Sequence, residues 1–346
     1  MDRATLFVLI LFGMALWGAY TIYYPFLLSM SVAMLLSMAT MNLTRQLDYI
    51  LSSRRIPGAR KLVTFIMVSL LVLLILAPLF YIATTGAEYL SHFDIQNVKH
   101  ILEKLRTLTE DIPYVGRWSQ EYLKVERVTP YIKEISIYLT TMGSKGLGFL
   151  KNILFVITFY AAIVYYQDRF FSLISTLIPA PREESENMVS ELASTMEVVL
   201  YSIIVTALFE GMLFGIFIAY FDFNGLLFGA IYGFASLIPI IGGAIVWAPL
   251  SLYAWSEIGG NSAIVIAIYS VVVISIIADT FVKPFIIKII KEEMLKNATR
   301  INELIIFFSI LAGMSTYGFW GMILGPAITT FLFASTRIYI KYSNSI

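Results

Sequence analysis

The sequence predicts an all-α, polytopic membrane protein, and its composition and long apolar runs point to this class. Of the 346 residues, 59% are hydrophobic and only 14% are charged, which is unlike a soluble globular domain. A hydrocarbon core of about 30 Å requires about 20 mostly apolar residues in a helix. Runs such as ITFYAAIVYY and VVVISIIA are apolar on every side, whereas the strands of a membrane barrel would alternate apolar and polar residues. Most of the chain is therefore expected to lie in lipid as helices.

Charge, cysteine content and motifs exclude several function classes. The 24 basic and 23 acidic residues nearly cancel, so there is no electrostatic footprint for nucleic acid. The absence of cysteine excludes disulfides, thiolate metal sites and cysteine nucleophiles within the chain. Because the sequence has no HExxH or GxSxG motif, we expect no enzyme, cofactor or metal site. His92 and His100 are expected to be solvated, because no third ligand clusters with them.

Three spans are expected in an N-terminal scaffold segment, residues 1–85. The first two cover about residues 4–20 and 24–41 and form a tight hairpin around Pro25. The third covers about residues 62–84. The loop before it carries Asp48 and an excess of basic residues, which are Arg45, Arg54, Arg55, Arg60 and Lys61. By the positive-inside rule this loop and the N-terminus are cytoplasmic.

The middle of the chain is expected to alternate between the two sides of the membrane. Residues 86–145 have balanced charge and apolar residues at helical spacing, which predicts a small amphipathic helical subdomain on the extracytoplasmic side. Residues 146–198 hold a fourth span, to about residue 166, and then an acidic cytoplasmic helix. Its charged residues include Asp168, Arg169 and Arg182, and its glutamates are residues 183, 184, 186, 191 and 197.

Two apolar segments of residues 199–346 are too short to form two spans each. A fifth span covers about residues 199–221 and a sixth covers about residues 263–286. Segment 225–255 lies between them and segment 304–333 follows, and each is interrupted centrally by glycine or proline. Two legs of about 15 residues reach only about 23 Å each, so both segments are predicted to be re-entrant helical hairpins. Their breaks contain Pro239, Gly242 and Gly243 in the first segment and Gly313, Gly318 and Gly321 in the second.

The order of these elements predicts an inverted repeat. Counting spans, the first hairpin enters from outside and the second from the cytoplasm, which leaves the C-terminus in the cytoplasm. A span followed by a hairpin, repeated in opposite orientation, is typical of secondary transporters, whose substrate site lies near midplane where broken helices meet. The alternative is that the glycines only permit tight helix packing, as small residues often do in membranes.

Three charged residues within the expected spans are candidates for ion or proton coupling. Glu210 falls near the centre of the fifth span, where a charge costs about 2.5 to 3.5 kcal/mol. Asp279 and Lys283 are placed to pair along one face of the sixth span, and Pro284 weakens the helix beside them. The alternatives are that Glu210 is a neutral, hydrogen-bonded acid and that the Asp279–Lys283 pair only lowers the cost of insertion.

Three blocks of sequence resemble the autoinducer-2 exporter family of bacterial membrane proteins. They are LIPIIGGAIVWAPL, ADTFVKPFIIKII and ILAGMSTYGFWGMILGPAITTFLF. The resemblance extends over nearly the full chain and implies an oligomeric transporter, with members assigned to export of a signalling furanone or to sodium (lithium)/proton antiport. It places family-pattern positions at Pro239, Gly242, Asp279, Pro284, Gly313, Gly318, Gly325 and Pro326.

Together these observations predict a multi-pass transporter of the cytoplasmic (inner) membrane that moves a small organic solute by alternating access. In this hypothesis the fifth and sixth spans and both hairpins move against the first four spans. Its expected partners are the lipid bilayer, the solute and further copies of itself. The alternatives are a sodium (lithium)/proton antiporter, with monovalent cations and protons as cargo, and a non-transporting scaffold that binds a partner protein.

Overall fold

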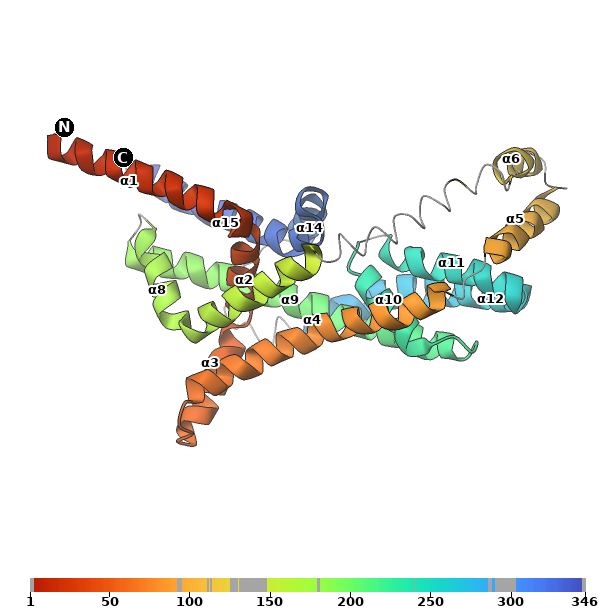
Figure 1. The fold of residues 1–346 in the computed structure, drawn as a ribbon, viewed down its shortest axis with the longest axis horizontal. Coiled ribbons are helices and arrows are strands. Elements are labelled where there is room, and N and C mark those ends of the chain that lie inside the picture. Colours follow the sequence, from red (N-terminus) through yellow and green to blue (C-terminus); the bar gives the residue numbers. More distant parts are fainter. Residues whose placement is uncertain are drawn as a thin grey trace. The chain divides into compact units, whose positions relative to one another are not determined.

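The structure of the protein is a computed structural model, and every regular element in its described residues is a helix (Figure 1). It describes residues 3–91, 95–110, 112, 114–124, 130, 148–178, 181–239, 241–285, 288–289 and 303–343. His92 and the side chains of His100 and Asp279 lie outside the described residues. The predicted all-α class is confirmed.

Six helical stretches in the described part of the chain are long and apolar enough to cross a membrane. They are Thr5–Ala39, Ala59–Gly86, Gly148–Tyr165, Arg182–Ala219, Gly260–Phe285 and Leu304–Lys341. The chain is therefore a multi-pass membrane protein. Three of these stretches differ from the expected boundaries. The first joins two predicted spans, the fourth begins at Arg182 and so includes part of the predicted acidic helix, and the last contains the second predicted hairpin.

The tight hairpin expected around Pro25 is wrong. Helix α1 (Arg3–Tyr23) continues through a single 3-10 turn, η1 (Tyr24–Phe26), into α2 (Leu27–Ala39). Tyr23, Phe26 and Leu27 all keep right-handed helical dihedral angles. Pro25 lies in the first turn after α1, where its missing N–H has no helical acceptor to lose. The proline therefore marks a change of helix type here and no reversal of the chain.

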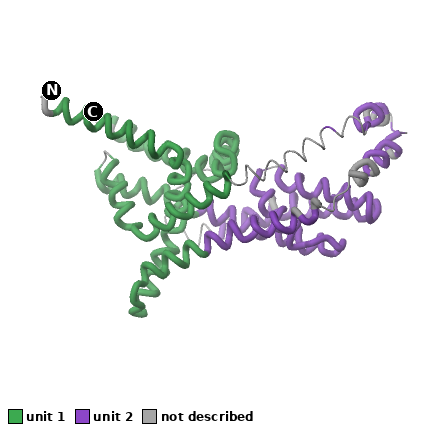
Figure 2. Tube along the Cα trace, viewed as in Figure 1, with its two compact units in different colours: residues 1–69, 148–197, 299–346 green, residues 70–147, 198–298 purple. Residues whose placement is uncertain are grey.

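The chain divides into two compact units (Figure 2). Unit 1 comprises Met1–Ser69, Gly148–Glu197 and Thr299–Ile346, and unit 2 comprises Leu70–Leu147 and Val198–Ala298. Helices α4 (Ala59–Ser91) and α9 (Arg182–Ala219) contribute residues to both units. The predicted division into scaffold, outer subdomain and transport core stays a prediction.

Unit 1 combines the N-terminal helices with the C-terminal ones. It contains α1, α2, α3 (Met41–Ser53), Gly148–Tyr165 and α8 (Gln167–Leu177), together with α14 (Glu303–Tyr317), η3 (Gly318–Trp320) and α15 (Gly321–Ser343). Helix α15 packs against α2, and both helices bury small or aliphatic side chains such as Ala33, Leu36 and Ala327. The second broken segment is thus joined to the N-terminal helices.

Unit 2 holds the first broken segment and the sixth span. It contains α10 (Gly225–Ala235), α11 (Gly242–Glu257), α12 (Gly260–Ile268) and the π-helix η2 (Tyr269–Val282). Its core is built from α9, α10, α11, α12 and η2, with Phe214, Ile218, Tyr232, Val246, Leu250, Ala254, Ile266, Ile274 and Ala278 buried together. Apolar side chains from the fifth span, the hairpin legs and the sixth span therefore share one core.

Two short helices of unit 2 fall in the predicted outer subdomain, α5 (Ile95–Thr109) and α6 (Val115–Tyr122). They are joined by hydrogen bonds from Thr109 to Ser119, 2.6 Å, and from Arg106 to Gln120, 2.6 Å. Helix α5 also packs on α11. The side of the membrane on which these helices lie stays a prediction.

Candidate functional site

Glu210 is buried in unit 2 and forms an ion pair with Lys283. Only 4% of Glu210 is exposed, and the Lys283 Nζ lies 3.4 Å from its Oε1. Glu210 belongs to α9, whereas Lys283 directly follows η2, so the pair joins the fifth and sixth spans. A charge within a membrane helix is retained mainly where another charge or water can balance it. Two of the three predicted coupling residues are therefore in direct contact.

The helix that leads to Lys283 has an unusual geometry. The structure assigns 14 residues, Tyr269–Val282, to a π-helix, and the Lys283 N–H donates to the Ala278 carbonyl in the same i to i−5 pattern. π-Helical turns are rare and are frequently found at functional sites. Pro284 follows at once and supplies no backbone donor to the preceding turn. The predicted pairing of Asp279 with Lys283 stays a prediction, since the Asp279 side chain is not described.

Aromatic contacts hold the beginning of η2 against α9. The rings of Phe217 and Tyr269 are stacked, with centroids 3.6 Å apart and planes 6° apart. The Tyr269 hydroxyl also donates to the Leu213 carbonyl at 3.3 Å. These contacts join the two helices at one end of η2, and the ion pair joins them just past the other end.

The first broken segment is a pair of packed helices whose connection contains the predicted break residues. After α10 ends, the Ile241 N–H donates to the Pro239 carbonyl at 2.9 Å, and α11 begins at Gly242. A Cβ added at Gly242 would collide with the Ala235 carbonyl, and one added at Gly243 would collide with the Tyr232 ring. Close approach of the two legs at this break therefore requires both glycines.

The second broken segment also folds back on itself. Helices α14 and α15 pack closely and are connected through η3, which begins at Gly318 with a φ of +60°. This left-handed conformation favours glycine. Along the legs, Cβ atoms at Gly313 or Gly321 would meet the other's backbone, and one at Gly325 would meet the Ser309 carbonyl. Both predicted breaks are thus real, while the depth of the hairpins in a bilayer stays a prediction.

Pro326 and Pro284 occupy different settings. Pro326 is buried inside α15, one residue after Gly325, and its carbonyl accepts a hydrogen bond from the Thr330 hydroxyl at 2.8 Å. Pro284 is exposed at the end of the sixth span. The first is therefore part of the packed second hairpin, and the second adjoins the Glu210–Lys283 pair.

Sequence reasoning missed a set of glycines that join α9 to α10. A Cβ at Gly211 would come within 2.6 Å of the Gly229 carbonyl, and one at Gly215 within 2.5 Å of the Gly225 carbonyl. The signal was present in GMLFG and GLLFGAIYG, where glycines recur at every fourth position. This small-xxx-small pattern permits close packing of membrane helices. Because Gly211 follows Glu210, the first hairpin is held directly beside the buried carboxylate.

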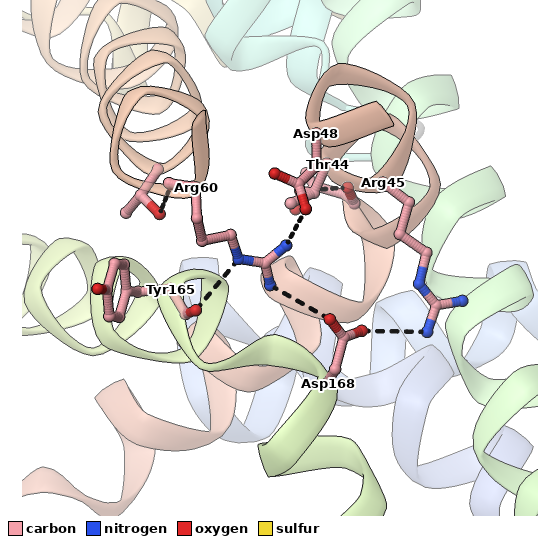
Figure 3. A network of polar contacts seen from close by, with 8 residues as sticks. Thr44, Arg45, Asp48, Arg60, Tyr165 and Asp168 are labelled. Carbon is pink, nitrogen blue, oxygen red and sulfur yellow. Dashed lines mark hydrogen bonds and ion pairs between the residues drawn. The ribbon is translucent and has the colours of Figure 1, made fainter. Parts of the chain in front are cut away.

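Unit 1 has a polar network next to the loop between α3 and α4, which the positive-inside rule predicts to be cytoplasmic (Figure 3). Arg60 donates from Nε to the Tyr165 carbonyl at 3.1 Å and from Nη1 to Asp48 at 3.2 Å. Its Nη2 lies 3.9 Å from Asp168, which also lies 3.6 Å from Arg45. The positive-inside rule uses these arginines only to predict topology, whereas in the structure they also connect α3, the beginning of α4 and the start of α8.

The acidic stretch of α9 is also partly balanced by the C-terminal helix. Glu191 pairs with Arg337, and Glu184 pairs with Lys341. Both basic residues lie on α15 beyond the second hairpin. The acidic composition of this segment, which the positive-inside rule left without explanation, thus matches basic residues at the other end of the sequence.

The fold and site define a class: a multi-pass helical membrane protein with two broken helical segments and a buried ion pair beside one of them. Residues 6–341 match the sequence model of the protein family described as "AI-2E family transporter". The chain belongs to this family of membrane transporters.

Relatives in bacteria agree with this assignment. Two proteins of Helicobacter pylori, from strains 26695 and J99, are each 30% identical, over 347 and 351 residues, covering 98% of this chain and 97% of the relative. A protein of Aquifex aeolicus is 24% identical over 302 residues, covering 81% of this chain and 82% of its own length. All three are named only as transport proteins, with no cargo.

Proposed function

We propose that this protein is a secondary transporter that moves a small organic solute across the cytoplasmic membrane by alternating access, with both termini in the cytoplasm. The observation that carries the proposal is the buried Glu210–Lys283 pair, which joins the fifth and sixth spans directly beside the first hairpin. A charge pair at the junction of two packed spans has two arrangements, paired and separated. A solute that binds one arrangement more tightly than the other shifts the protein toward it. The protein acts on its cargo by binding and release, without chemical conversion.

In this proposal, backbone groups at the break of the first hairpin, within unit 2, contribute ligands to the solute. Broken helices expose carbonyl and N–H groups that membrane helices otherwise bond internally, and these are suitable ligands for a polar, uncharged solute. The connection at Pro239 in unit 2 and the turn at Gly318 in unit 1 each interrupt an apolar helical segment of the described chain. Homo-oligomer formation, expected from the family resemblance, is part of this proposal.

The proposal is tested by flux into proteoliposomes that contain the purified protein. Uptake of a furanone is measured in vesicles with the wild-type protein, with Glu210→Gln, and with Glu257→Gln as a matched control, because Glu257 is exposed at the end of α11. We expect flux with the wild type and the control, and a loss of at least tenfold with Glu210→Gln. Equal furanone flux in all three vesicles would contradict the role of the pair.

The buried carboxylate also favours a second candidate, exchange of sodium or lithium for protons. A carboxylate in an apolar setting is a ligand for a hard cation, which prefers oxygen. An internal pH dye distinguishes the candidates: cation-driven proton movement that Glu210→Gln abolishes supports antiport. A furanone flux without this signal supports solute export, and no flux of either kind supports a scaffold.

A further inference from the structure

A second carboxyl group is buried on α9, outside the pair described above. Glu197 lies within the stretch Arg182–Ala219, just before residue 199, where the sequence predicts the start of the fifth span, and only 2% of it is exposed. Its Oε2 accepts a hydrogen bond from the Asn42 Nδ2 at 2.6 Å. Its Oε1 is buried and has no hydrogen-bond partner among the described residues. Such an oxygen in a native structure requires an explanation, because burying it without a partner is unfavourable.

The junction of α2 and α3 positions the side chain that contacts Glu197. Thr40 interrupts the helix with φ −102° and ψ 7°, and its hydroxyl lies 2.9 Å from the Tyr160 hydroxyl of the fourth span. Asn42 follows in the first turn of α3. The junction is thus anchored on the fourth span while Asn42 reaches the carboxyl of Glu197 on α9.

Three basic groups on neighbouring elements lie close to other acids. Arg45 of α3 lies near Asp168, and Arg337 and Lys341 of α15 pair with Glu191 and Glu184. The described charged and titratable side chains on these elements of unit 1 are Arg45, Asp48 and Tyr49 of α3, Lys151, Tyr160 and Tyr165 of the fourth span, Asp168 and Arg169 of α8, Arg182, Glu183, Glu184, Glu186 and Glu191 of α9, and Arg337, Tyr339 and Lys341 of α15. None of the described ion pairs includes Glu197.

The two buried carboxyls of α9 therefore differ in what can balance their charge. Glu210 has the Lys283 ammonium at 3.4 Å, whereas Glu197 has the neutral amide of Asn42. A buried carboxylate without a cation loses its charge by taking up a proton. We propose that Glu197 is a proton-binding site, in which Oε1 takes a proton from cytoplasmic water and returns it while Asn42 holds Oε2. That this proton serves the transport cycle rests on the proposed function.

The site is tested by infrared spectroscopy of the full-length protein in lipid vesicles. The carboxylic acid C=O band is followed as the pH changes, in the wild type, in Glu197→Gln, and in Glu186→Gln as a control on the exposed side of the same helix. Glutamine keeps the shape of glutamate and still accepts from Asn42, so the variant is expected to fold. We expect Glu197→Gln to lose the equivalent of a single titrating carboxyl per chain, and Glu186→Gln to retain the buried band.

Asn42→Ala gives an independent check. Loss of the hydrogen bond to the ionised oxygen favours the protonated form, so the band should remain while its titration midpoint moves to higher pH. An unchanged set of bands in Glu197→Gln, or an unchanged midpoint in Asn42→Ala, would overturn the proton site.

Flux measurements separate this proposal from the proposed function. Proton binding at Glu197 without any transport would leave the site standing and refute the transporter mechanism. Transport whose pH dependence is the same in Glu197→Gln and the wild type would refute the use of this proton in the cycle. Loss of the pH dependence in Glu197→Gln, with flux retained, is the expected result.

Discussion

The two broken helical segments look alike in sequence but close in different ways. In the second, α14 and α15 face each other through Gly313, Gly321 and Gly325, so the glycines join the two legs of one hairpin. In the first, the glycines of α10 face α9, and α10 meets α11 closely at the break, where Gly242 approaches Ala235. The second hairpin is thus a self-contained pair of helices. In the first hairpin, α10 packs along the preceding span, α9, at least as closely as it packs against α11.

This difference bears on how each broken segment is expected to move. A hairpin whose legs are joined by backbone contact along their length is expected to move as one body. A hairpin whose first leg is joined to α9 is expected to move with α9, and therefore with Glu210. The two broken segments thus have different packing partners, and within unit 2 the buried charge pair involves the same helix, α9, on which the first hairpin packs.

The largest expected effect comes from breaking the charge pair beside the first hairpin. Glu210→Gln leaves the Lys283 ammonium without this carboxylate, and loss of one partner of a buried pair costs about 3 kcal/mol. The loss should be at the lower end of the usual range, because the Lys283 side chain is 35% exposed. Thermal unfolding in detergent measures it. The double variant Glu210→Gln, Lys283→Gln should recover part of the loss, and equal stability of the single and double variants would contradict the pairing.

The next effect is on the legs of the second hairpin. Gly321→Ala places a methyl group against the Gly313 backbone and forces α14 and α15 apart, which costs about 1–3 kcal/mol. Gly13→Ala on α1 is the matched control, because its Cβ would meet nothing within 4 Å. The unfolding temperature of each variant is measured, and we expect it to fall in Gly321→Ala and not in Gly13→Ala. Equal values would mean that the close contact of the legs is absent.

A smaller effect should separate the partners of α10. Gly229→Ala brings a Cβ to 2.7 Å from the Gly211 carbonyl and should loosen α10 from α9, with a cost of about 1 kcal/mol or more. Amide hydrogen exchange should then rise in residues 207–219 and 225–235 and stay unchanged in residues 242–257. Gly242→Ala should instead raise exchange at the α10–α11 connection. The same exchange pattern in both variants would contradict the claim that α10 packs on α9 along its length and meets α11 closely at the break.

The smallest effect concerns the end of α11, where the first hairpin meets α5. Lys104 of α5 donates to the Trp255 carbonyl at 3.0 Å, in the last turn of α11, and its Nζ lies 5.0 Å from the Trp255 ring centroid. Lys104→Ala removes this helix-end contact and the cation–π interaction, which together contribute about 0.5–1 kcal/mol. Hydrogen exchange at the end of α11 should rise, and Lys124→Ala, at an exposed position after α6, should leave it unchanged.

The local breaks were predictable because each depends on residues a few positions apart. Pro239, Gly242 and Gly318 interrupt apolar runs that are too short to cross twice, and the structure breaks its helices at these places. Gly313, also predicted to lie at a break, is inside α14, where it faces Gly321. The same reasoning failed at Pro25, because a proline in the first turn of a helix can be accommodated without a reversal. At Pro25 the local sequence predicts where the helix is interrupted. The angle between the two helices depends on how the following helix packs.

Composition and hydropathy, which are properties of the sequence alone, determined the membrane class, the helical character and the cost of placing Glu210 in a span, because the bilayer demands internal hydrogen bonding and apolar surfaces from any chain. The partners of the charged and glycine residues depended on tertiary structure: Lys283 beside Glu210, Asn42 beside Glu197, and α9 beside the glycines of α10. Each of these contacts joins residues that are distant in sequence, and only helix packing brings them within the few ångströms over which hydrogen bonds and ion pairs act.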